Sequence, residues 1–242
     1  LVWFQSQEKA RLAELKRQEK ARLAELKRQE TECLKSKGFF HNGKCFSKEE
    51  LKKMKELIQK RNLVPIPAGE FWMGSKKGVG ASDERPRHKV KITRPFYMSK
   101  TEVTQKLWKK VMGNNPSYFK GNNLPVEQVS WYDAIRFLNK LSKLDGLEPV
   151  YHINGNYDLD SKLRHNKGEY PTGLDKTLVI SWNRTRNGYR LPTEAEFEYA
   201  AKAGTELKYA GSNNLDEVAW YGYKRAGKKT HPVGNKKANA WG

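Results

Sequence analysis

Three glutamates lie within five residues of the stretch YRLPTEAEFEYAAKAG, which spans residues 189–204. Glu194, Glu196 and Glu198 could serve in acid–base chemistry, bind a metal or stabilise a helix. Thr193 follows a proline and precedes Glu196 by three residues, which is the spacing of a helix capping box. Acidic residues in a first turn also oppose the positive end of the helix dipole. We interpret Glu194 and Glu196 as structural, and the role of Glu198 stays open.

The same stretch predicts a short helix with one apolar stripe. Phe197, Ala200 and Ala201 recur at helical spacing. Gly204 is expected to end the helix, because glycine readily adopts the left-handed conformation found after helix C-termini.

Two cysteines, Cys33 and Cys45, bracket the segment CLKSKGFFHNGKC. A zinc site would need four ligands at tighter spacing, and His41 is the only histidine between the cysteines. A catalytic thiol would need a base placed by the fold. The short loop with its glycines favours a disulfide between Cys33 and Cys45, which contributes roughly 3 kcal/mol in the chain-entropy model. Such a bond predicts an extracytoplasmic location, in a periplasm or cell envelope.

The chain is strongly basic, with a formal net charge of +20. The excess positive charge is spread along the sequence, and no zinc-finger, KH or RRM signature accompanies it, so nucleic acid is disfavoured as a partner. An anionic envelope component or an acidic protein fits the charge at least as well. The opening residues LVWF are either a frayed start or the last turn of an anchoring segment that precedes Leu1.

A tandem repeat precedes the cysteines. The 11-residue unit QEKARLAELKR occurs twice over residues 7–28. Its period predicts a helical coiled-coil stalk over residues 1–32, nearly straight or with a slight right-handed twist. The stripe is expected to bind a protein partner or a second copy, and the alternative is a solvated spacer helix. The leucines that share one face are Leu12, Leu15, Leu23 and Leu26.

Two further segments follow the stalk. Residues 33–62 should hold the cysteine loop and a charged helix, capped by Ser47 with Glu50 three residues on. Residues 63–242 change character, because proline, glycine and aromatic residues replace lysine and glutamate. A half-buried strand is expected around Val90 and Ile92.

Short helices are predicted after Thr104 and Ser130, and residues 150–186 look like a long polar excursion. Other site candidates in this part are weak. The sequence NRT at 183–185 fits a glycosylation sequon, whereas the isolated histidines are interpreted as packing or surface residues: His88, His152 and His231.

One segment alternates polar side chains in the manner of a calcium loop. The expected glycine is replaced by Leu159, and His165 stands where a bidentate glutamate is needed, so we interpret it as a polar loop. The alternating residues are Asn154, Asn156, Asp158 and Asp160.

Seven motifs occur in the same order as in a known family. They are IPAGEFWMGS (66–75), ERPRHKV (84–90), FYMSKTEVTQKLW (96–108), NPSYF (115–119), LPVEQVSWYDAIRFLNKLS (124–142), NGYRLPTEAEFEYAAKAG (187–204) and THPVG (230–234). Together they resemble the formylglycine-generating enzyme, or sulfatase-modifying factor, family. The resemblance implies an α+β fold, a variant of the C-type lectin fold with little regular secondary structure. In that family the RLPTEAE helix is chiefly structural.

The resemblance does not carry a catalytic site onto this chain. The family's enzymes oxidise a sulfatase cysteine with a pair of copper-holding cysteines in the C-terminal third, and neither Cys33 nor Cys45 matches them. The family also binds calcium, but the corresponding stretch here, residues 218–229, holds lysine and arginine instead of asparagine and aspartate. No catalytic, cofactor or metal residue is therefore assigned.

We expect a non-catalytic binding or scaffold domain displayed on a helical stalk. In every case we expect the polypeptide to continue past Gly242 into a GNVWEW-like segment. One alternative is a formylglycine-generating oxidase of which this is an N-terminal part. The other alternative is a lectin-like ligand-display protein.

Overall fold

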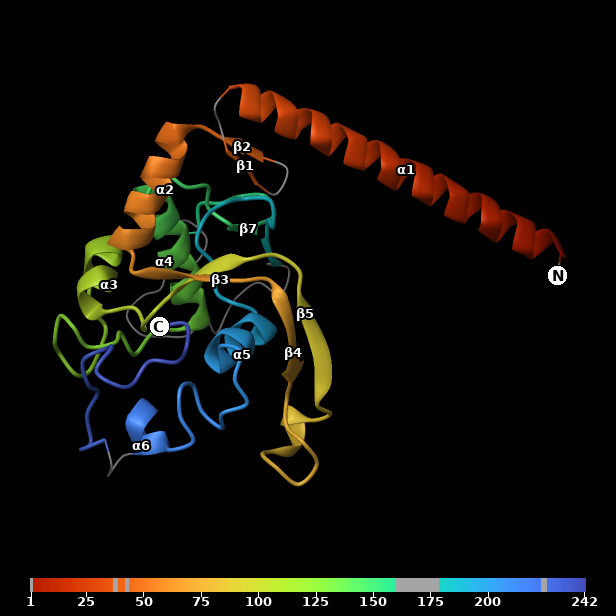
Figure 1. Ribbon diagram of the computed structural model, residues 1–242. Helices are drawn as coiled ribbons and strands as arrows, with labels where there is room; N and C mark the ends of the chain where they lie inside the picture. The colour runs from red at the N-terminus through yellow and green to blue at the C-terminus, as the bar shows by residue number, and fades with distance from the viewer. Residues whose placement is uncertain (1, 37–38, 42–43, 160–178, 223–225) are drawn as a thin grey trace. The chain divides into compact units, whose positions relative to one another are not determined.

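The computed structural model describes residues 2–36, 39–41, 44–159, 179–222 and 226–242. The chain forms two compact units, Leu1–Arg61 and Asn62–Gly242. Figure 1 shows the elements of both units.

The first unit consists of a long helix, a small hairpin and a second helix. Strands β1 and β2 pair antiparallel, with Phe40 opposite Cys45. The elements are α1 (Val2–Lys35), β1 (Phe39–His41), β2 (Lys44–Phe46) and α2 (Lys48–Lys60).

Helix α1 covers both copies of the 11-residue repeat. Alanine, leucine, glutamate, lysine and arginine are all strong helix formers, and Arg28 donates to Glu25 at 2.9 Å on the helix surface. Leu12, Leu15 and Leu23 are 54%, 53% and 54% exposed, so these stripe leucines face solvent in the single chain, and Leu26 is half-buried. None of the helices in the described part of the chain is long and apolar enough to cross a membrane.

The capping box predicted for α2 is confirmed. The Glu50 amide donates to the Ser47 hydroxyl oxygen at 3.1 Å, and the Ser47 amide donates to the Glu50 carboxylate at 2.7 Å. The two bonds satisfy backbone donors that the first turn of a helix leaves without partners.

The second unit is built from short elements joined by long irregular segments (Figure 1). Its strands within the described residues pair two by two, β3 with β6, β4 with β5 and β7 with β8, all antiparallel. The strands are β3 (Leu63–Ile66), β4 (Gly69–Met73), β5 (His88–Ile92), β6 (Phe96–Ser99), β7 (Tyr151–Ile153) and β8 (Ile180–Trp182). The helices are η1 (Ser82–Glu84), α3 (Gln105–Met112), α4 (Trp131–Leu144), α5 (Glu194–Lys202) and α6 (Leu215–Val218).

Three buried clusters replace a single sheet-based core. One joins α3 and α4, where Trp108 stacks on Phe137 with ring centroids 4.9 Å apart. Another joins α5 to β4 and β5, which lie beside it in Figure 1. In this cluster Gly69 is required by close packing, because a Cβ there would overlap the Tyr199 hydroxyl.

The strand and both short helices expected in this unit are present. In β5 Ile92 is buried and the lysines are exposed. Helix α3 is capped by Thr104 and ends at Gly113, which has a φ of 82°. Helix α4 starts at Ser130 with a full capping box.

The apolar stripe predicted for α5 is wrong at one position. Phe197 is 60% exposed, whereas Tyr199 and Ala200 are 6% exposed. Tertiary packing determines which face is buried. The centroid of the Tyr199 ring lies 5.2 Å from that of Phe71 and 5.0 Å from that of Trp241. The helix ends at Lys202.

The interpretation of residues 150–186 as a polar excursion is also wrong for its described part. Strands β7 and β8 pair antiparallel, and their residues contribute to a buried cluster that includes Val150 and Ile153. The buried Asn139 side chain accepts from the Tyr151 amide at 3.1 Å and donates to the Tyr151 carbonyl at 2.7 Å. These two hydrogen bonds join β7 to α4. Residues 160–178 lie outside the described residues.

Candidate binding surface

The carboxylate of Glu196 is occupied by structural contacts. Both Arg190 guanidinium nitrogens donate to it, each at 2.6 Å, and the Thr193 amide donates at 2.9 Å. Burial opposes the charged form of this carboxyl, but the hydrogen bonds from Arg190 and Thr193 outweigh burial and lower its pKa. Glu196 is therefore a charged cap and ion-pair partner.

Glu198, whose role the sequence left open, also has structural partners. The Gly74 amide, at the end of β4, donates to its Oε1 at 2.9 Å. Lys202 lies one turn further along α5, and its Nζ is 2.7 Å from the same oxygen. The Lys202 ammonium also donates to the Trp72 carbonyl at 2.5 Å. These contacts fasten α5 to the end of β4.

The three glutamates do not converge on one site. Glu196 points to Arg190 and Glu198 to Gly74, while Glu194 is exposed in the first turn. An acid–base pair needs two carboxyl groups that face one reacting atom. Because these carboxyl groups do not, we interpret the helix as structural.

A buried glutamine organises the loop between α3 and α4. The Gln105 side chain, 1% exposed, donates to the carbonyls of Phe119 and Pro125 at 2.7 and 3.1 Å. Its oxygen accepts from Asn115 at 2.9 Å and from the Gly121 amide at 3.1 Å. All the polar capacity of a buried amide is used, which makes the loop costly to deform.

This pinned loop presents an aromatic side chain to solvent. The Phe119 amide donates to the Glu127 carboxylate at 2.9 Å, which fixes the backbone beside Tyr118. Tyr118 itself is 76% exposed. Trp131, at the first turn of α4, is half exposed and contacts Tyr132 edge-on. Large exposed aromatics on rigid backbone are typical of binding surfaces, and the sequence analysis did not single them out.

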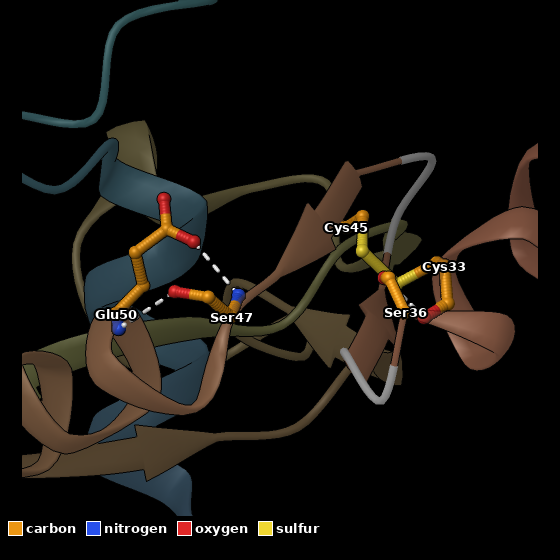
Figure 2. Close-up of a disulfide and its surroundings, with 5 residues drawn as sticks. All are labelled: Cys33, Ser36, Cys45, Ser47 and Glu50. Carbon is orange, nitrogen blue, oxygen red and sulfur yellow. Dashed lines mark hydrogen bonds between the residues drawn. A yellow bond between two sulfur atoms is a disulfide. The ribbon is translucent and has the colours of Figure 1, made fainter.

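Both cysteines are joined in the predicted disulfide. The bond links Cys33, near the end of α1, to Cys45 in β2, and their Cα atoms are 5.5 Å apart. Figure 2 shows it beside Ser36, whose hydroxyl donates to the Cys33 carbonyl at 2.7 Å, and close to the Ser47–Glu50 capping box. The chain has no other cysteine, so no free thiol remains.

The residues present do not fit the family's copper centre, which requires a pair of thiolates. Both cysteine sulfurs of this chain are joined in the disulfide and belong to the first unit. For calcium, the described residues contain no group of three histidine, cysteine, aspartate or glutamate side chains placed to hold a metal. Asp160 and His165 of the calcium-like segment lie outside the described residues. Asn156 instead accepts from the Asp158 amide at 2.8 Å, as in a local turn.

Comparison with known proteins matches residues 47–242 to the family described as sulfatase-modifying factor enzyme 1-like domain. The chain belongs to the sulfatase-modifying factor family. Its relatives include the chaperone protein LppX of Paenibacillus barcinonensis, 46% identical over 167 residues, or 61% of this chain and 57% of the relative. The formylglycine-generating enzyme of Bos taurus is 31% identical over 198 residues, 74% of this chain and 46% of that enzyme. The chain thus spans about half the length of these relatives.

Similarity to solved structures, together with the family match, confirms the predicted fold class. Treponema denticola variable protein 1 superposes with a TM-score of 0.63 at 37% identity, covering 74% of this chain and 67% of that chain. The structure of CarF gives a TM-score of 0.53 at 26% identity, covering 74% of each chain.

Proposed function

We propose that this chain is a non-catalytic binding or scaffold protein of the sulfatase-modifying factor family, working outside the cytoplasm in the cell envelope. The observation that carries the proposal is the Cys33–Cys45 disulfide. It removes the two cysteine sulfurs of these 242 residues from thiol and metal chemistry, and it suits an oxidising compartment. The name of the relative LppX, a chaperone protein, agrees with a role in binding rather than oxidation.

Binding would use the exposed aromatics of the second unit. Tyr118 is held out by a loop that is already ordered by Gln105 and Glu127, so little conformational entropy is lost when a ligand covers it. A protein surface with exposed apolar groups is the partner class that we favour, because aromatic side chains anchor many protein interfaces.

A direct test of the non-catalytic role is an oxidation assay. The full-length protein, with any sequence that follows Gly242, would be incubated with a cysteine-containing sulfatase peptide, copper(I) and oxygen, and the peptide analysed by mass spectrometry. The bovine formylglycine-generating enzyme serves as the positive control. We expect unchanged peptide with this chain. Conversion of the cysteine to formylglycine would overturn the proposal.

A lectin-like display protein is the second candidate. The exposed rings of Tyr118 and Trp131 favour it, because aromatic rings can cover the apolar face of a ligand. The two candidate functions can be distinguished by testing the binding of the chain to immobilised oligosaccharides and to a reduced, unfolded test protein. The binding proposal expects retention on the unfolded protein and its loss in Tyr118→Ala but not in the exposed control Val79→Ala. Retention on oligosaccharides alone would favour the lectin.

A further inference from the structure

The leucine stripe of α1 has an acidic residue at its centre. In an 11-residue repeat that spans three turns, residues spaced three, four and four apart share one face. That face contains Glu19, which lies four residues from both Leu15 and Leu23, and Glu30, which lies four residues after Leu26. Each repeat therefore contributes two leucines and one glutamate to the same face.

Basic residues line both edges of this stripe. Lys16 and Lys27 each follow a stripe leucine by four residues, on one edge. Arg11 and Arg22 each precede a stripe leucine by four residues, on the other edge. All four are exposed. The stripe thus carries negative charge along its centre and positive charge along both borders.

In the described part of α1, the glutamates on the back of the helix and those of the stripe differ in whether they contact another side chain. On the back, Glu25 pairs with Arg28 at 2.9 Å, and Glu14 accepts from Gln18 at 3.1 Å. Within the described residues, Glu19 and Glu30 make no hydrogen bond or ion pair of this kind. The glutamates on the back of the helix are paired with residues of the same helix. The acidic, basic and apolar groups of the stripe can instead be matched by another helix.

We propose that the stripe binds the same stripe of a second copy of this chain. A partner helix must share the 11-residue period, because a seven-residue repeat drifts around the helix relative to it. A second copy has that period over the whole length of the repeat. When leucine pairs face each other, Glu19 of one chain lies opposite Glu19 of the other. Each carboxylate can turn from that like charge to the partner's Lys16 and Arg22, which lie three residues away along the helix.

The pairing joins each acidic centre to the partner's basic borders. Lysine and arginine side chains are long enough to reach across a helix seam while their aliphatic stems cover leucine. The same contact occurs twice by symmetry, as expected for a self-complementary interface. The proposal concerns the stalk and does not depend on what the second unit binds.

The test is the mass of the full chain in solution, measured by sedimentation over a range of concentrations. We expect a concentration-dependent dimer. Substituting all four stripe leucines with glutamine should leave only monomer, with the helix content checked by circular dichroism. Wild-type chain that stays monomeric at its highest soluble concentration would overturn the proposal, as would a dimer that survives the leucine substitutions.

Charge variants keep the proposal testable if the leucine variant loses its helix. Glu19→Lys with Glu30→Lys should weaken the dimer about tenfold or more. The back-face pair Glu14→Lys with Glu25→Lys makes the same charge change and should weaken it far less. Equal effects of the two pairs would contradict the seam.

Mixing two variants with complementary charges tests the pairing by restoring association. The variant with lysine at positions 19 and 30 is combined with a second variant that bears Lys16→Glu, Arg22→Glu and Lys27→Glu. Neither variant should dimerise well alone, and the mixture should form a heterodimer. Failure of the mixture to associate, with both chains helical, would overturn the charge pairing.

Discussion

In α1, Leu12 and Leu23 are each 54% exposed, whereas in α4 Ile135 and Phe137 are 0% and 2% exposed. The first unit relies on helix propensity, pairs one turn apart and a disulfide. The second unit relies on three buried clusters and fully bonded buried amides such as Gln105. A regular sequence can thus fold locally with its apolar face exposed, while an irregular one must bury its own apolar residues.

Substitutions in the buried core of the second unit should lower the free energy of unfolding most. Phe137→Ala should lower the free energy of unfolding by about 3–5 kcal/mol, because it removes a fully buried ring and leaves a cavity beside Trp108. Phe197→Ala, at a ring that is 60% exposed, should change it by less than about 0.5 kcal/mol. Denaturant unfolding followed by tryptophan fluorescence measures both. Similar losses would show that the burial of the two rings is misassigned.

Loss of the disulfide should affect the first unit alone. Cys33→Ser with Cys45→Ser should destabilise the hairpin by about 3 kcal/mol, because the reduced chain gains the entropy of an open loop. Amide hydrogen exchange should accelerate in β1 and β2 and stay unchanged in α4. Faster exchange in α4 would mean that the two units are not stabilised separately.

The ion pair of Glu196 should give the second unit a pH dependence. Since the folded-state pKa of this carboxyl is lowered, its stabilisation is present above the unfolded value of about 4.3 and is lost as the pH falls through the folded pKa. Glu196→Gln should cost about 1–3 kcal/mol at neutral pH, since Arg190 loses a charged acceptor. The variant should also flatten the acid limb of the stability curve. An acid limb identical to that of the wild type would contradict the assignment.

The smallest expected effect is at the cap of α2. Ser47→Ala should lower local stability by about 1 kcal/mol, because the Glu50 amide loses its acceptor. Ser47→Asp keeps an acceptor and should behave like the wild type. Hydrogen exchange at the first turn of α2 checks both, and equal exchange in the two variants would exclude the cap as a stabilising element.

Features that depend on neighbouring residues were predictable from the sequence. The capping boxes at Ser47 and Thr193 are confirmed, because all their atoms belong to residues within three positions of each other. The disulfide followed from a short loop with glycines, and the fold class followed from seven ordered motifs.

Features that depend on distant residues were not predictable. Phe197 and Tyr199 are both aromatic and two positions apart, and only contacts with Phe71 and Trp241 decide which one is buried. The exposed Tyr118 depends on a network around Gln105 that joins residues 10 to 20 positions away. Sequence shows the aromatic residue but not the backbone that holds it in solvent.

Our proposal depends most on Cys33 and Cys45, whose disulfide stabilises the first unit and leaves neither thiol free for chemistry. The most direct measurement is a count of free thiols in the full chain isolated without reductant, by alkylation under denaturing conditions followed by intact mass. We expect no alkylated cysteine before reduction and two after it. Two alkylated cysteines before reduction would contradict it.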